Sequence, residues 1–208
     1  MRYLIPMLAV LAAASPAVAA PCQGPQGLPS PGAPLPLVEG QFRYSTEHGL
    51  GCTVSSQQGA AMAKHESPVT FLPCLRIGAI GISDSLDQVE KLLGPPVDIT
   101  DMGVFSESRI YEVAQRGALR PHYVVTYYDS RVVAVQLIGP PMVIPAKFSG
   151  LVLGDDQQKI IDTLGWPEKR CQAKGGGIEM WTWANFPIAI DVIDGFAAGF
   201  KVTWAAGR

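Results

Sequence analysis

GISDSLDQVEKLLGPP, residues 81–96, decides the expected fold, because a similar stretch recurs 71 positions later as VLGDDQQKIIDTLGWP, residues 152–167. Each stretch passes from an apolar residue to an aspartate, then to helix-forming residues, and ends in Leu-Gly-x-Pro. Ordinary helix-ending chemistry can produce Leu-Gly-x-Pro twice by chance. The segments that follow the two stretches also match, so the sequence predicts an internal repeat.

Each stretch predicts a short helix with recognisable ends. Ser85 and Gln88 form a capping box at the start of the first helix, and Asp155 with Asp156 caps the second. A glycine, closely followed by proline, ends each helix. Apolar side chains at helical spacing make one stripe on each helix: Leu86, Val89, Leu92 and Leu93 in the first, and Ile160, Ile161 and Leu164 in the second.

Alternating apolar and polar residues predict three strands after each helix. Asp129-Ser130 and Asp194-Gly195 are typical of tight hairpin turns between strands. One face of the strands is apolar and the other is small or polar, as in an antiparallel sheet covered on one side. The predicted fold class is α+β, with two tandem helix-plus-three-strand antiparallel units that form one sheet and helices packed on one face. The expected strands are 109–114, 123–129 and 131–138, then 179–185, 188–194 and 196–204.

The chain divides by composition into five parts. The first has an apolar core and small residues before its end, as in a cleavable secretory signal. A lead rich in proline and glycine follows, and then a loop-rich segment with cysteines, in which we expect a strand at 41–45 and a short helix at 59–64. The parts are the signal at 1–20, the lead at 21–36, the loop-rich segment at 37–75, repeat unit 1 at 76–140 and repeat unit 2 at 147–204.

Charge and hydropathy limit the classes of partner. The chain has 16 basic and 18 acidic residues and no basic patch, which argues against nucleic-acid binding. After residue 20 no apolar run approaches the roughly 18 residues of a bilayer span, so we expect no transmembrane segment. The signal predicts a periplasmic or secreted protein.

Four cysteines follow the signal, and an even number in an exported chain predicts two disulfides. Three pairings are open. Cys52–Cys74 is favoured because both lie in the loop-rich segment, which leaves Cys22–Cys171. Metal or redox roles are disfavoured, because there is no CxxC and no cysteine lies at ligand spacing from a histidine. Pro21, directly before Cys22, argues against lipidation of that cysteine.

The sequence contains no recognisable catalytic motif. His65-Glu66 does not begin an HExxH motif, and His122 follows a proline in a predicted loop. Helix capping explains Asp155-Asp156, and the glycines at 175–177 lack the Lys-Ser/Thr of a phosphate-binding loop. We therefore expect no catalytic residues, no metal site and no cofactor, and a protein that is not an enzyme.

Two tryptophans, Trp181 and Trp183, fall on the same side of one expected strand. They either join the core, as large aromatic residues usually do, or lie on the open face of the sheet as an apolar patch. In the second case they would anchor a protein partner, with Asp191 and Lys201 as polar neighbours.

The repeated pattern of apolar strand, Asp, short helix, Gly-x-Pro and antiparallel strands over residues 80–204 resembles one superfamily. It is similar to the group that contains the SmpA/OmlA outer-membrane assembly lipoproteins and the β-lactamase inhibitor proteins. In the inhibitors, two tandem units form one sheet whose open face binds a partner. The assembly lipoproteins are lipidated and usually have one unit, whereas this chain has two units and no lipobox.

The resemblance implies a non-catalytic binding module that recognises another envelope or secreted protein through the open face of its sheet. One alternative is a periplasmic protein that binds a small ligand in a cleft between the two units. Another is a hydrolase whose site is assembled in space around His122 or His65. The sequence does not define the oligomeric state.

Overall fold

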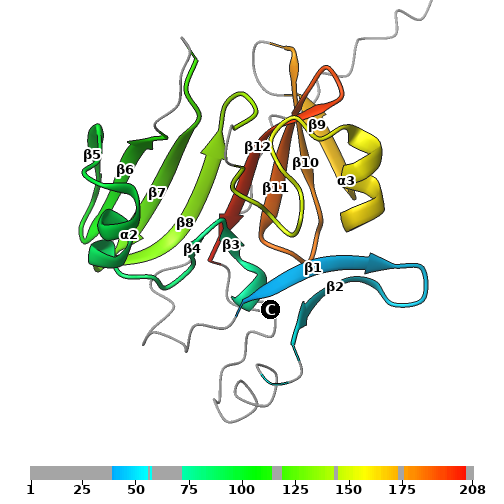
Figure 1. Cartoon of the computed structure of the whole chain (residues 1–208), viewed down its shortest axis with the longest axis horizontal. Helices are drawn as coiled ribbons and strands as arrows, with labels where there is room; N and C mark the ends of the chain where they lie inside the picture. The colour runs from blue at the N-terminus through cyan, green and yellow to red at the C-terminus, as the bar shows by residue number, and fades with distance from the viewer. Residues whose placement is uncertain are drawn as a thin grey trace, which may run out of the picture.

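The computed structural model describes residues 39–55, 57, 72–113, 119–142, 145–172 and 176–204. Its centre is one antiparallel sheet of eight strands in the order β5-β6-β7-β8-β12-β11-β10-β9 (Figure 1). The predicted signal, the proline-rich lead and the predicted helix at 59–64 lie outside the described residues. The sheet strands are β5 (Asp98–Gly103), β6 (Ser106–Glu112), β7 (His122–Tyr128), β8 (Arg131–Ile138), β9 (Lys169–Gln172), β10 (Ile178–Thr182), β11 (Ile188–Ile193) and β12 (Phe196–Thr203).

Smaller elements lie outside this sheet. Two hairpins, two α-helices of eight residues each and one short 3-10 helix make up the rest of the described secondary structure. They are β1 (Gly40–Ser45), β2 (Gly49–Val54), η1 (Leu72–Cys74), β3 (Arg76–Ile77), β4 (Ile80–Gly81), α2 (Leu86–Leu93) and α3 (Gln157–Leu164).

Both predicted helices form, with the predicted ends. At α2, the Ser85 hydroxyl accepts a hydrogen bond from the backbone N–H of Gln88, and the Gln88 side chain accepts one from the N–H of Ser85. This is the predicted capping box. Asp156 caps α3 in the same way, accepting from the N–H of Lys159 at 2.8 Å. Glycines at positive φ end both helices, as expected.

Both predicted hairpin turns are also confirmed. Asp129 and Ser130 have φ values of 49° and 60°, and Asp194 and Gly195 have 51° and 83°. Two successive residues with positive φ are the mark of the turn that best matches the right-handed twist of antiparallel strands. These turns join β7 to β8 and β11 to β12.

The predicted α+β class, two helix-plus-three-strand units with helices packed over one face, is wrong. The structure is mostly β, and β2, β5 and β9 were not expected as strands. Each α-helix is only about 12 Å long, whereas the eight-stranded sheet measures about 34 Å between its edge strands. Two such helices cannot form a layer over this sheet, so hairpins and loops supply most of its cover.

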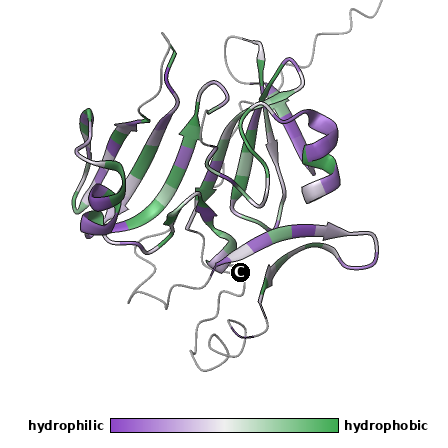
Figure 2. Cartoon of the chain, viewed as in Figure 1, coloured by the Kyte–Doolittle hydropathy of each residue, from purple (hydrophilic) through white to green (hydrophobic). Residues whose placement is uncertain are grey.

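The hydrophobic core lies between one face of the sheet and these smaller elements. Val89 of α2 and Ile160 of α3 are fully buried against it, as is Phe42 of β1. Phe42 contacts Phe148 with ring centroids 6.2 Å apart, and Phe148 contacts Phe200 of β12 at 5.5 Å. Figure 2 shows long hydrophobic stretches along the central strand β8, whereas both helices are largely hydrophilic. The helices therefore contribute a few apolar side chains rather than a broad buried face.

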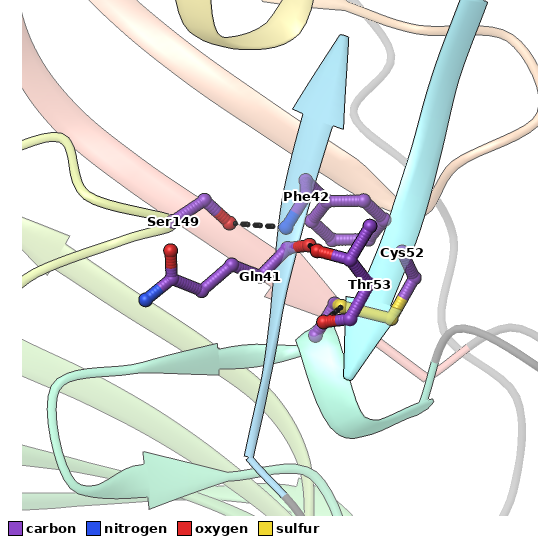
Figure 3. Close-up of a disulfide and its surroundings, with 6 residues drawn as sticks. Gln41, Phe42, Cys52, Thr53 and Ser149 are labelled. Carbon is purple, nitrogen blue, oxygen red and sulfur yellow. Dashed lines mark hydrogen bonds between the residues drawn. A yellow bond between two sulfur atoms is a disulfide. The ribbon is translucent and has the colours of Figure 1, made fainter. Parts of the chain in front are cut away.

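A disulfide holds the β1–β2 hairpin to the rest of the chain (Figure 3). Cys52 of β2 is bonded to Cys74 of η1, with the two Cα atoms 5.9 Å apart, which confirms the favoured pairing. In addition, Ser149 Oγ accepts a hydrogen bond of 2.9 Å from the backbone N–H of Phe42. Cys171 is also disulfide-bonded, and its expected partner Cys22 lies outside the described residues.

Candidate functional site: the open face of the sheet

The second face of the eight-stranded sheet is the candidate site, and we call it the open face. Along β7 the burial alternates: Tyr123, Val125 and Tyr127 are buried in the core, whereas the residues between them remain partly exposed. The α-helices and the β1–β2 hairpin place their buried side chains in the core on the other side. Part of the open face is itself covered, since Ala189 and Thr203 on this side are only 2% exposed, whereas Gln136, Asp191 and Lys201 remain partly exposed.

The structure places both predicted tryptophans in the core. Trp181 is fully buried, and Trp183 is only 6% exposed. The indole N–H of Trp181 donates to Glu179 Oε2 at 3.0 Å, and the Arg170 guanidinium lies 4.8 Å from the centroid of the Trp181 ring. The interpretation of these tryptophans as an exposed partner-binding patch is therefore wrong. Trp181 is paired with the fully buried Ile190, which places it on the covered side of the sheet.

Asp191 and Lys201 lie on the open face, opposite the side that holds Trp181. Asp191 of β11 is paired with Gly199 of β12, and Lys201 of β12 is paired with Gln136 of β8. The Gln136 amide donates to Asp191 Oδ2 at 3.4 Å. A Cβ atom at Gly199 would lie 3.0 Å from the same oxygen, so glycine leaves room for the carboxylate. We call Asp191, Gln136 and Lys201 the central polar cluster.

The sequence alone does not identify Gln136 as a member of this cluster. Its place depends on the pairing of β8 with β12, the one pairing in the eight-stranded sheet between strands that are not consecutive in the chain. Alternation along β8 predicts only that Gln136 faces away from the core. No local feature of the sequence indicates which residue of β12 lies beside Gln136.

Burial shapes the electrostatics of the central polar cluster. Desolvation raises the pKa of Asp191 above its ordinary value, and this outweighs the opposite effects of the Gln136 hydrogen bond and the charge of Lys201. A carboxylate that is harder to ionise in the folded protein than in the unfolded chain lowers stability at neutral pH. The Asp191 carboxylate is therefore partly desolvated, and another hydrogen-bond donor or a cation beside it would stabilise its charged form.

Asparagine at position 191 should raise the free energy of unfolding at pH 7. In the wild type the folded-state pKa is the higher one, so stability falls as the pH rises from the unfolded-state pKa through the folded-state pKa. Asp191→Asn removes this loss, so its stability advantage over wild type should be smallest at pH 3 and should grow as the pH rises toward 7. Urea unfolding at a series of pH values measures it, with Asp162→Asn on exposed α3 as control. If Asp191→Asn is less stable than wild type at pH 7, the predicted sign of the stability change is contradicted.

A row of apolar side chains lies at one end of the open face. Ile178 of β10 is paired with Ile193 of β11, which is paired with Phe196 of β12. These side chains are exposed by 37%, 38% and 52%. We call them the apolar row. Strict alternation back from Phe200 would place Phe196 on the core face, but a register shift after Asp191 moves it to the open face.

The histidines do not form a catalytic group in the described residues. His122 begins β7 and pairs with Glu112 of β6, whose carboxylate is bound by Arg120 at 3.0 Å. His48 lies exposed beside Glu47, and His65 lies outside the described residues. In the same ranges, no three side chains of His, Cys, Asp or Glu gather as a metal site would require. No described helix is long and apolar enough to cross a membrane.

Comparisons with known proteins add little to this geometry. No protein-family profile matches the chain, and no curated protein sequence matches it. Among solved structures, the chain is similar to a cysteine-rich secretory protein from Staphylococcus aureus subsp. aureus Mu50, with 12% sequence identity and a TM-score of 0.39. The match covers 59% of this chain and 44% of that protein, so it spans less than half of the other protein's length. A likeness at this level supports no functional inference.

Proposed function

We propose that this protein is an exported, non-catalytic binding module whose open face recognises another envelope or secreted protein. The observation that carries the proposal is the combination, on the open face, of an exposed apolar row and a partly desolvated polar cluster. Protein interfaces commonly have such an arrangement, with apolar anchors beside a few oriented polar groups. The sequence resemblance to the SmpA/OmlA and β-lactamase-inhibitor superfamily implies the same mode of binding.

The two parts of the face have complementary roles in this proposal. The apolar row offers three neighbouring side chains on adjacent strands, which lose contact with water when a partner covers them. The central polar cluster offers the carboxylate of Asp191, whose cost of burial is reduced when a donor of the partner completes its hydrogen bonds. The apolar row would supply affinity, and the cluster would orient the partner.

The Cys52–Cys74 disulfide fits an exported protein, because disulfides persist in oxidising compartments. The predicted signal at 1–20 and the proline directly before Cys22 support release into the periplasm or the medium without a lipid anchor. The partner would accordingly be found in the cell envelope or outside the cell.

An arginine at position 136 tests the proposal, because it places a long, charged side chain in the middle of the open face. We expect Gln136→Arg to weaken capture of the partner by at least about tenfold, because the bulk prevents close contact with the cluster. The measurement is quantitative mass spectrometry of envelope proteins retained by the disulfide-bonded mature protein. Gln158→Arg is the matched control, since Gln158 is exposed on α3 away from this face.

The comparison of the two variants decides the result. A protein retained by wild type and by Gln158→Arg, but lost with Gln136→Arg, supports recognition through the open face. A partner retained equally by both variants would place the binding surface elsewhere. Thermal unfolding of both variants must match wild type for the comparison to hold.

A further inference from the structure

The edge strand β5 and the residues on either side of it carry an unusual concentration of exposed apolar side chains. Twelve large hydrophobic side chains are exposed in the described residues, and six of them lie between positions 92 and 105. Ile99 is 53% exposed, and Phe105, in the turn after β5, is 70% exposed. Single exposed apolar residues are ordinary on a protein surface, whereas half of the exposed large apolar side chains falling in one short segment is not, and it favours an interaction site there. The six are Leu92, Val97, Ile99, Met102, Val104 and Phe105.

The backbone of β5 offers a second feature of a docking site. β5 pairs with β6 on one side, and no described strand pairs with its other side. All six of its residues are exposed. The outer N–H and C=O groups of an edge strand are a template for an added strand. Natural proteins usually protect such edges with charged residues or bulges, and β5 has both, yet its apolar side chains remain uncovered.

The charges near β5 indicate what kind of strand fits. Asp98 and Thr100 project to the open-face side of the sheet, whereas Ile99 projects to the other side, opposite Arg109. Arg109 is already paired with Glu90 and Glu107, so its positive charge is neutralised. The carboxylate of Asp98 has no described ion pair. An added strand is therefore favoured when it carries basic side chains toward Asp98 and apolar ones toward Ile99.

A second copy of this chain fits the edge less well. Two paired β5 strands would each carry Asp98 and Asp101 and no basic residue. Like charges on adjacent strands destabilise a sheet. The opposite edge, β9, has Lys169 and Arg170, but Arg170 is bound to Glu179 at 2.6 Å and stacks over Trp181. Lys169 is then the single basic side chain of β9 without a described ion pair, so this edge of a second copy offers less positive charge than a segment with several basic side chains.

We infer that β5 takes an extended segment of another protein as a ninth strand of the sheet, with basic and apolar side chains alternating along that segment. Main-chain hydrogen bonds to the outer edge of β5 would supply affinity, and the alternating side chains would supply specificity. This surface is separate from the apolar row, which lies on β10, β11 and β12 toward the other edge. The inference therefore goes beyond the proposed function and does not depend on it.

The test uses a synthetic probe in place of an unidentified partner. A fluorescein-labelled peptide of alternating valine and lysine, six residues long like β5, is titrated with the disulfide-bonded mature protein at about 0.15 M salt. Fluorescence anisotropy measures binding. A peptide of the same composition with all valines before all lysines serves as the control for alternation, and a valine–glutamate peptide serves as the control for charge.

Asp98→Lys is the informative variant. Reversing this charge places like charges across the new strand pair, so binding of the valine–lysine peptide should weaken by about tenfold. Asp162→Lys makes the same change in net charge on α3, far from the edge in the sequence, and should leave the affinity unchanged. Gln136→Arg should also leave it unchanged, which separates this surface from the open face.

The outcomes are distinct. Tight binding of the alternating basic peptide alone, lost with Asp98→Lys and kept with Asp162→Lys, supports the inference. An equal loss of peptide affinity in Asp98→Lys and Asp162→Lys would mean that binding depends on general charge attraction, and it would overturn the inference. Absence of binding at millimolar peptide would overturn it as well. Self-association in sedimentation velocity that Asp98→Lys alters would assign the edge to a second copy instead.

Discussion

Alanine in place of Trp181 is expected to lower the free energy of unfolding by about 3–5 kcal/mol. The side chain is fully buried between β10 and the elements that cover the sheet, and it belongs to the hydrophobic core. Its loss removes a large apolar volume and leaves a cavity that the rigid sheet cannot close. It also removes the indole donor of Glu179 and the ring over which Arg170 stacks.

Urea unfolding followed by far-ultraviolet circular dichroism measures this effect, since the fluorescence signal itself changes with the tryptophan. Trp166→Ala is the matched control, because Trp166 is 71% exposed in the connection between α3 and β9. The control should change stability by less than about 0.5 kcal/mol. Similar losses in the two variants would contradict the placement of Trp181 in the core.

Removal of the Cys52–Cys74 disulfide has the next largest expected effect. Replacing both cysteines with alanine should lower the free energy of unfolding by about 3 kcal/mol, because the bond closes a loop with a sequence separation of 22. The bond limits the freedom of the unfolded chain, and in the folded protein it ties β2 to η1 (Figure 3). Alanine is preferable to serine because Cys74 is almost fully buried.

The double alanine variant is better than chemical reduction, because a reductant would also act on the disulfide of Cys171. Urea unfolding of the variant gives the stability change, and the denaturant dependence shows whether the unfolded chain has expanded. A change below about 0.5 kcal/mol would mean that hydrogen bonds such as Phe42 to Ser149 hold the hairpin without the covalent link.

The sequence correctly predicted the features that depend only on residues close together in the chain. The capping box of Ser85 and Gln88, the cap at Asp156, the turn at Asp129-Ser130 and the full range of β8 are as expected. Each depends on residues a few positions apart, where side-chain and backbone preferences act directly.

The fold class could not be predicted because the missed strands have no periodic pattern. β5 reads DITDMG and is exposed throughout, so it lacks the apolar-polar alternation that marks a half-buried strand. β9 reads KRCQ and has no buried residue. Both are strands because the neighbouring edge of the sheet offers hydrogen bonds, and this is a tertiary effect.

The candidate site was predicted only in part. Alternation placed Asp191 and Lys201 away from the core, as found, but Trp181 and Trp183 were joined to them as one possible patch although they face the other side. Period-two alternation indicates which residues share a face within one strand. It does not indicate which face other elements cover, since that depends on contacts with segments such as β1 and α3.

The pairing of β8 with β12 has a consequence for how the chain reaches its native state. Every other neighbour pair in the eight-stranded sheet is formed by strands that follow one another in the sequence, and these pairs need only short loops to close. β8 and β12 are separated by α3 and three strands, so their contact closes a long loop at a greater entropic cost. We therefore expect local hairpins to form early, and the pairing of β8 with β12, which joins the two four-stranded halves, to be the slow step of folding.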